Sequence, residues 1–277
     1  MFTLNDGRTL PAIGFGTYQL QGEDGTGAIV SALEAGYRLL DTAVNYQNHA
    51  EVGEALRRSG LPREDVWVTT KIPGRAHERA KAVEAVEAVE RSLEELGVDR
   101  VDLVLVHWPN PSQGRYVEAF EALVECRERG LTGSVGVSNF TEQHLDDVIT
   151  ATGVAPVVNQ IEVHPLFPQG QMVRANADRQ VLTQSWSPLG KRQAQYHSPA
   201  VTGPAERLGA TPAQVILAWH LARGLMPIPK SGTPQRQVDN LAADRLELLE
   251  EEVEAITALG RPDGRLFGGD PTTHEEL

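Results

Sequence analysis

Cysteine is almost absent from this sequence, since Cys126 is the single one among 277 residues. One thiol can form neither an intramolecular disulfide nor a cysteine-ligated zinc site. Cys126 falls in a stretch with helical periodicity, and we expect a partly buried, unreactive thiol there. The sequence also lacks the HExxH spacing of zinc enzymes, and Glu162 and His164 stand two residues apart on an expected strand end. We therefore expect no metal site.

Long apolar runs are absent as well. No run approaches the ~20 apolar residues that a transmembrane helix needs. The first ten residues, MFTLNDGRTL, lack the basic and apolar segments of a signal peptide. Neither coiled-coil heptads nor a long apolar stripe stands out. We expect a cytoplasmic protein that is monomeric.

Basic residues are fewer than acidic ones, with 25 against 38 and a net charge of −13. Such a charge repels nucleic acid and anionic membrane surfaces. The one dense basic cluster is small and surrounds Lys230 and Arg236. We expect a small-molecule partner, with no nucleic acid and no membrane.

Short apolar strands alternate with helices along the whole chain, after a hairpin whose turn is Asn5-Asp6-Gly7. No linker divides the sequence, so we expect one domain over residues 1–277. Strands are predicted at Ala12–Phe15, Tyr37–Asp41, Val66–Lys71, Val101–His107, Ser134–Val137, Val157–Ile161, Val181–Trp186 and Met226–Ile228. Helices are predicted at Asp24–Glu34, Ala50–Arg58, Glu78–Leu96, Val117–Arg129, Glu142–Ala151, Gln171–Ala177, Pro199–Leu208, Pro212–Ala222, Gln235–Ala242 and Leu248–Leu259, followed by a loop-like tail.

Eight such strands predict an α/β fold of the (β/α)8 TIM-barrel type, with an N-terminal β-hairpin and extra C-terminal helices. An open doubly wound sheet is the alternative, and it needs a Gly-rich phosphate fingerprint after the first strand. The nearest match, Gly14 to Gln19, lacks the third glycine and no helix starts there. The barrel is therefore the favoured fold.

Polar and aromatic residues follow the predicted strands at the ends where a barrel carries its active site. Each of these residues alone has an ordinary structural explanation, such as a solvated lysine or a capping histidine. Together they indicate a site, because seven successive strands deliver them to one rim. They are Asp41, Tyr46, Lys71, His107, Trp108, Ser138, Asn139, Gln160, Glu162, His164, Ser185, Trp186, Ser187, Lys230 and Ser231.

Four of these residues suit acid catalysis by a phenol. A free tyrosine has a pKa near 10 and is a weak acid at neutral pH. A buried ammonium beside it lowers that pKa, and the ammonium needs a counter-charge of its own. Tyr46, Lys71 and Asp41 fit these three parts, and His107 can hydrogen-bond a substrate oxygen.

Three stretches of the sequence resemble signatures of the aldo-keto reductases. They are GYRLLDTAVNYQNHAEVGEAL (residues 36–56), GSVGVSNF (133–140) and IPKSGTPQR (228–236). The shorter matches TTK, VHWP, NQIEVHP and SWSPLG occur in the right order, so the resemblance covers essentially the full length. It is closest to the compact prokaryotic members that include the 2,5-diketogluconate reductases.

The resemblance implies a barrel enzyme that uses NADPH, with Asp41, Tyr46, Lys71 and His107 as its catalytic residues. Its cofactor site has three parts: carboxamide contacts, a ring stacked on the nicotinamide, and a grip on the phosphates and the adenine. These residues are, in that order, Ser138, Asn139 and Gln160; Trp186; and Ser187, Leu189, Gly190, Lys230, Ser231, Thr233, Arg236, Asp239 and Asn240. Independently, a lysine, two hydroxyls and an arginine within seven residues suit a phosphomonoester, although Ser231 or Thr233 could simply cap a helix.

Three positions depart from the family pattern. Asn48-His49 replaces an Asn-Glu pair, and Gly133 replaces a basic residue. Pro73 stands where many members carry a pocket tryptophan, which removes an aromatic wall and leaves the substrate undefined. The remaining candidates for substrate contacts are Tyr18, Trp108 and Phe267.

We expect NADPH-dependent reduction of an aldehyde or ketone with Tyr46 as the general acid. One alternative is a cofactor-binding sensor or structural protein on the same fold with little turnover. Another is a barrel lyase or sugar-phosphate isomerase, which needs a phosphate-binding glycine loop that Pro188-Leu189-Gly190 matches poorly.

Overall fold

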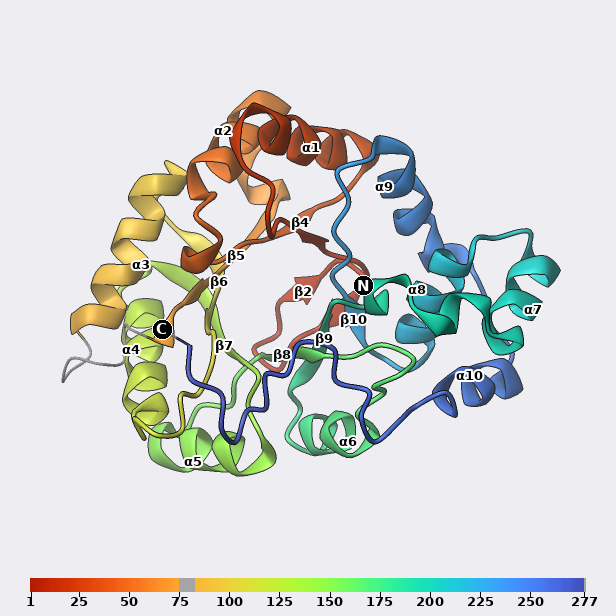
Figure 1. Ribbon diagram of the computed structural model, residues 1–277. Helices are drawn as coiled ribbons and strands as arrows, with labels where there is room; N and C mark the ends of the chain where they lie inside the picture. Colours follow the sequence, from red (N-terminus) through yellow and green to blue (C-terminus); the bar gives the residue numbers. More distant parts are fainter. Residues whose placement is uncertain (75–82, 277) are drawn as a thin grey trace.

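Eight parallel strands form the centre of the computed structural model, which describes residues 1–74 and 83–276 (Figure 1). Their order in the sheet is their order in the chain. Backbone hydrogen bonds from Gly14 N to Pro227 O and from Gly16 N to Pro229 O, both 3.1 Å, join the first strand to the last and close the barrel. The strands are β3 (Phe15–Gly16), β4 (Leu39–Asp41), β5 (Trp67–Ile72), β6 (Val101–Val106), β7 (Thr132–Ser138), β8 (Val158–Glu162), β9 (Leu182–Trp186) and β10 (Met226–Pro227).

Helices surround the strands on the outside (Figure 1). None of the helices in the described part of the chain is long and apolar enough to cross a bilayer. The α-helices are α1 (Gly22–Ala35), α2 (His49–Ser59), α3 (Val83–Leu96), α4 (Tyr116–Glu128), α5 (Glu142–Thr152), α6 (Gly170–Asp178), α7 (Pro199–Leu208), α8 (Pro212–Ala222), α9 (Pro234–Leu241) and α10 (Glu250–Thr257). The 3₁₀ turns include η1 (Val44–Tyr46), η4 (Gly190–Arg192), η5 (Ala194–His197) and η6 (Ala242–Arg245), and the predicted beginning of the third helix at Glu78 lies outside the described residues.

The helix-facing side of the sheet carries the larger part of the apolar core. On α3, Val86, Val89, Leu93 and Leu96 recur every three or four residues, and all four are buried, as the periodicity predicted. Burying one such side chain stabilises the fold by roughly 1.5–3 kcal/mol. Cys126 lies in this core and is fully rather than partly buried, and burial raises the pKa of its thiol to about 12.

The N-terminal hairpin closes the barrel at the end where the strands begin. Its strands β1 (Phe2–Thr3) and β2 (Thr9–Leu10) pair antiparallel, and Gly7 has the positive φ, +86°, that the turn requires. Leu4 and Leu10 are buried against Leu103 and Met226 inside the barrel. The sealed lower end leaves the C-terminal ends of the strands as the mouth of the barrel.

Candidate active site

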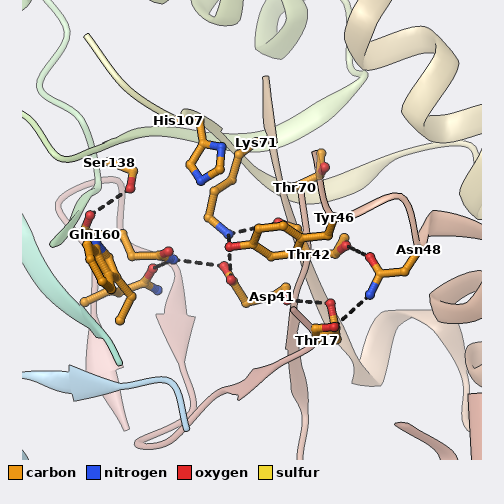
Figure 2. Close-up of polar contacts among 12 residues, drawn as sticks. Thr17, Asp41, Thr42, Tyr46, Asn48, Thr70, Lys71, His107, Ser138 and Gln160 are labelled. Atoms are coloured by element: carbon orange, nitrogen blue, oxygen red, sulfur yellow. Dashed lines mark hydrogen bonds and ion pairs between the residues drawn. The ribbon is translucent and has the colours of Figure 1, made fainter. Parts of the chain in front are cut away.

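The buried ammonium of Lys71 connects the residues at the centre of the mouth (Figure 2). Lys71 Nζ donates to Asp41 Oδ1 at 2.6 Å, to Thr42 O at 3.0 Å and to Tyr46 Oη at 3.2 Å. The Lys71 side chain has no exposed surface, and Asp41 is 3% exposed. Strands β4 and β5 are neighbours, so their C-terminal residues meet at the same edge.

Burial and charge act in opposite directions on these groups. Burial works to lower the pKa of Lys71, but Asp41 and Tyr46 outweigh it, and the pKa is raised. Burial raises the pKa of the Tyr46 phenol, and Lys71 offsets only part of this rise. The expectation that Lys71 brings the pKa of the phenol below its usual value is therefore wrong. The phenol stays protonated at neutral pH, as a proton donor must.

A polar network behind the loop holds Tyr46 in place. Thr42 Oγ1 donates to Asn48 Oδ1 at 2.7 Å, and Asn48 Nδ2 donates to Thr17 O at 2.8 Å and to Leu20 O at 3.1 Å (Figure 2). Thr17 Oγ1 in turn donates to Asp41 O at 2.9 Å. Because Asn48 and Thr17 have no exposed surface, the network fixes the loop that carries the phenol.

His107 follows β6 and reaches the same space. Its ring centroid lies 6.0 Å from that of Tyr46, and its backbone N donates to Ile72 O on the neighbouring strand at 3.1 Å. The structure thus brings together all four residues that the sequence suggested for acid catalysis. His107 Nδ1 lies 2.7 Å from Glu276 Oε1 in the tail.

The predicted carboxamide contacts lie side by side at the ends of β7 and β8. Ser138 Oγ donates to Gln160 O at 2.8 Å, and Asn139 Nδ2 donates to His107 O at 3.1 Å. Trp186 Nε1 donates to Asn139 Oδ1 at 2.9 Å, and Gln160 Nε2 donates to Asp41 Oδ2 at 2.9 Å. These bonds orient the polar floor of the mouth and connect it to the Lys71 cluster.

A cavity of about 530 Å³ opens above this floor. The loop after β9 supplies Ser187, Leu189 and Gly190 to its wall, and Lys230 extends it toward α9. The other predicted contacts at this end lie on α9 or directly before it. Thr233 and Arg236 are exposed, Asp239 is half-buried and Asn240 is buried. Ser231 Oγ accepts from Thr233 N at 3.1 Å in the turn before α9, while Thr233, the N-cap residue of that helix, makes no side-chain capping hydrogen bond.

Aromatic side chains form the outer rim of the cavity. Tyr18 packs edge-on against Tyr46 with ring centroids 5.1 Å apart, and Phe267 lies 5.3 Å from Trp186. Trp108 lines the same cavity. The three residues suggested for substrate contacts therefore face the space in front of the phenol.

The sequence profile of the Aldo/keto reductase family matches residues 12–261, which include the whole of this mouth except part of the tail. The chain belongs to the aldo/keto reductase family. It is 48% identical to 2,5-diketo-D-gluconic acid reductase B of Corynebacterium sp. (strain SHS752001) over 275 residues, which cover 99% of this chain and 98% of that protein.

Solved structures share the fold of this aldo/keto reductase. The crystal structure of Gox0644 in its apo form superposes with a TM-score of 0.93 at 38% identity, covering 99% of this chain and 98% of that one. A variant of Gox0644 in complex with NADPH superposes with a TM-score of 0.92 at the same identity and the same coverage of both chains.

For three polar residues of this aldo/keto reductase, the sequence did not predict a role in the site. Thr17 and Asn48 hold the Tyr46 loop, and a buried polar network of this kind leaves no periodic signal. Glu276 contacts His107 from a tail that reads as featureless loop. Among the residues that the structure describes, no three His, Cys, Asp or Glu side chains gather as a metal site would require.

Proposed function

We propose that this aldo/keto reductase reduces aldehydes or ketones to alcohols with NADPH, and that Tyr46 is the general acid. The observation that carries the proposal is the 3.2 Å hydrogen bond from Lys71 Nζ to Tyr46 Oη at the floor of an open cavity. A phenol held beside a buried, charged ammonium can give up a proton and leave a stabilised phenolate.

The residues at the two ends of the mouth fit an extended phosphorylated dinucleotide. Ser138, Asn139 and Gln160 offer hydroxyl and amide groups near the phenol, and Trp186 lines the cavity next to them. At the other end, Lys230 and Arg236 are exposed and form no ion pair with any carboxylate in the described part of the chain. Two unpaired cations before and within the first turns of α9 suit the 2′-phosphate that distinguishes NADPH from NADH.

The protein's own groups then have distinct tasks. When bound, NADPH supplies the hydride that passes to the carbonyl carbon. Tyr46 Oη gives its proton to the carbonyl oxygen as negative charge develops there. Lys71 stabilises the phenolate that remains, and Asp41 keeps Lys71 charged despite its burial. His107 hydrogen-bonds the same oxygen and orients the carbonyl group.

A steady-state screen tests this proposal: NADPH oxidation is followed with aldehydes, α-dicarbonyls, keto-sugars and steroids. The relative named 2,5-diketo-D-gluconic acid reductase B makes keto-sugar acids the first substrates to include. We expect turnover with at least one class. Tight NADPH binding, detected by tryptophan fluorescence, without turnover of any carbonyl would instead support the sensor alternative.

The proposal includes a monomeric, cytoplasmic enzyme made of one barrel domain. Light scattering after size-exclusion chromatography measures the mass in solution, and cell fractionation measures the location. A cooperative, single unfolding transition in urea is the result expected of one domain.

A further inference from the structure

Glu276 lies beside the active site although it comes from the far end of the described chain. The tail after α10 crosses the mouth of the barrel, as the blue trace in Figure 1 shows. The Glu276 side chain is largely buried, with 11% of its surface exposed. Its Oε1 accepts from Asn45 Nδ2 at 2.7 Å, and its Oε2 accepts from Gly74 N at 2.9 Å. Asn45 is the neighbour of Tyr46, so the carboxylate also contacts the loop of the phenol.

Asn110 holds the backbone of the same residue. Asn110 Nδ2 donates to Glu276 O at 2.7 Å, and Glu276 N donates to Asn110 Oδ1 at 3.1 Å. The tail passes so close to Gly74 that a Cβ there would lie 2.3 Å from Glu276 O. Gly74 thus leaves room for the tail, one residue after the position where the sequence suggested a missing aromatic wall. Glu276 therefore contacts four residues, Asn45, Gly74, Asn110 and His107, and does not simply lie on the surface.

The carboxylate meets the ring of His107. Glu276 Oε1 lies 2.7 Å from His107 Nδ1, in a close contact less well aligned than a directed hydrogen bond. Burial works to raise the pKa of the Glu276 carboxyl, but His107, Gly74 and Asn45 outweigh it and lower that pKa. A carboxylate only accepts hydrogen bonds, so it favours the ring form with a proton on Nδ1. Nε2 then faces the substrate oxygen, and it donates to a carbonyl oxygen when the ring carries a proton on Nε2 as well.

Other ionisable groups surround His107 on the neighbouring elements. Tyr46 on η1 lies 6.0 Å away between ring centroids, and Lys71 on β5 is paired with Asp41 on β4 behind it. In the tail, His274 stacks on Trp108, the residue after His107, with centroids 4.2 Å apart. All of these groups remain when Glu276 alone is changed, so a comparison of variants isolates its carboxylate.

We propose that Glu276 is a positioning residue for His107, which holds the imidazole ring so that Nε2 meets the oxygen of the substrate carbonyl. The inference rests on the proposed reductase function, because that function makes His107 the group that orients the substrate. It adds to the site a residue from the tail, at a position beyond the part of the chain that the family profile matches.

The first test is kinetic and replaces Glu276 by glutamine, which keeps the size and removes the charge. We expect Glu276→Gln to lower kcat for a neutral aldehyde by about tenfold, part of the roughly 10²–10⁴-fold that a well-placed acid–base group contributes. NADPH affinity, from tryptophan fluorescence, stays unchanged because no proposed cofactor contact is altered. Glu276→Asp keeps the charge and recovers part of kcat. The control is Glu275→Gln, which removes a charge one residue away, where the carboxylate accepts from Ser112 N at 2.7 Å; it leaves kcat unchanged.

The second test does not depend on turnover. Long-range ¹H–¹⁵N spectra of labelled histidine, assigned with His107→Asn, report which ring nitrogens of His107 carry a proton. In the unaltered protein Nδ1 carries one, and in Glu276→Gln the proton population of Nδ1 falls relative to that of Nε2 because the carboxylate that favours a proton on Nδ1 is gone. If the unaltered protein turns over no carbonyl, the proposed function fails, yet this measurement still tests the contact.

Three results overturn the positioning role. The first is equal kcat for the unaltered protein, Glu276→Gln and Glu275→Gln. The second is a distribution of protons between Nδ1 and Nε2 of His107 that is identical with and without the carboxylate. The third is a loss of NADPH affinity that matches the loss of kcat, because it would mean that the substitution disturbs the whole mouth.

Discussion

The Lys71 ammonium lies 3.2 Å from the Tyr46 hydroxyl, and the lysine side chain has no exposed surface. A hydrogen bond of this kind stabilises a phenolate more than a phenol, so it becomes stronger as the proton leaves. We expect Tyr46→Phe to lower kcat for aldehyde reduction by about 10²–10⁴-fold while NADPH binding is retained. Fluorescence titration and NADPH oxidation measure the two quantities separately. Near-normal reduction of a reactive aldehyde would remove Tyr46 from its proposed role.

Asp41 is the counter-ion of the buried Lys71 ammonium. Lys71 depends on the 2.6 Å contact with Asp41 Oδ1, so Asp41→Asn leaves a buried ammonium without its counter-ion. We expect this change to reduce the free energy of unfolding by roughly 3–5 kcal/mol, measured by urea titration. Glu23→Gln breaks the exposed ion pair with Arg58 and serves as the control, with no measurable loss expected. Equal stabilities of the two variants would contradict the buried-charge argument.

Lys230 and Arg236 are proposed to bind the 2′-phosphate of the cofactor. The double change Lys230→Ala with Arg236→Ala removes two charge-assisted contacts, so we expect the Kd of NADPH to rise by about tenfold or more. NADH lacks that phosphate, and its Kd stays within about twofold. Titrations with both cofactors at one ionic strength measure the difference. Equal losses for NADPH and NADH would show that these residues do not recognise the phosphate.

His220 on α8 is buried under the loop that lines the cavity, and its Nε2 lies 3.1 Å from Pro188 O. Burial lowers the pKa of His220 to about 3 from 6.5. Below pH 6.5 the unfolded chain binds a proton at His220 that the folded protein does not bind. The free energy of unfolding therefore decreases as the pH falls from 6.5 toward 3. Between pH 6 and pH 5 this decrease in the free energy of unfolding approaches about 1.4 kcal/mol per pH unit.

We expect His220→Gln to flatten the pH dependence of the free energy of unfolding by that amount. Urea titrations at pH 7, 6 and 5 measure it. His197→Gln alters an exposed histidine on η5 and is the matched control. An unchanged slope in His220→Gln would mean that the buried ring already carries a proton.

Gly74 offers a second way to displace Glu276 without changing a charge. A Cβ at this position would lie 2.3 Å from Glu276 O and 2.0 Å from Asn110 Nδ2. We therefore expect Gly74→Ala to move the tail and lower kcat by about tenfold, as Glu276→Gln does. Gly27→Ala on α1, where nothing lies within 4 Å of the added carbon, leaves kcat unchanged. Full activity of Gly74→Ala would separate the tail from catalysis.

The local chemistry of the chain was enough to predict much of the fold. Helices α7 and α8 begin and end at the predicted residues, because Ser198 and Thr211 cap them and a proline follows each cap. The first strand was predicted at Ala12–Phe15 but is Phe15–Gly16. Its limits are set by pairing across the closed barrel, and a short strand carries no local signal for that.

The residues at the centre of the site could likewise be predicted from the strand ends, since parallel strands bring those ends together. The direction of the Tyr46 pKa shift could not be predicted from the sequence. It depends on whether the rise caused by burial is larger than the decrease caused by the Lys71 ammonium. Glu276 could not be placed either. A tail without periodicity gives no indication of which surface it will cross, and its contact with His107 depends on the whole barrel being closed.

The contacts of Glu276 also bear on how the enzyme folds. Its partners Asn110, Gly74 and Asn45 are 166, 202 and 231 residues away along the chain, whereas neighbouring strands pair in sequence order. Contacts that close such long loops form late, after local structure has made their entropy cost smaller. We therefore expect a refolding chain to regain its helices before Glu276 reaches His107, and full activity to return last.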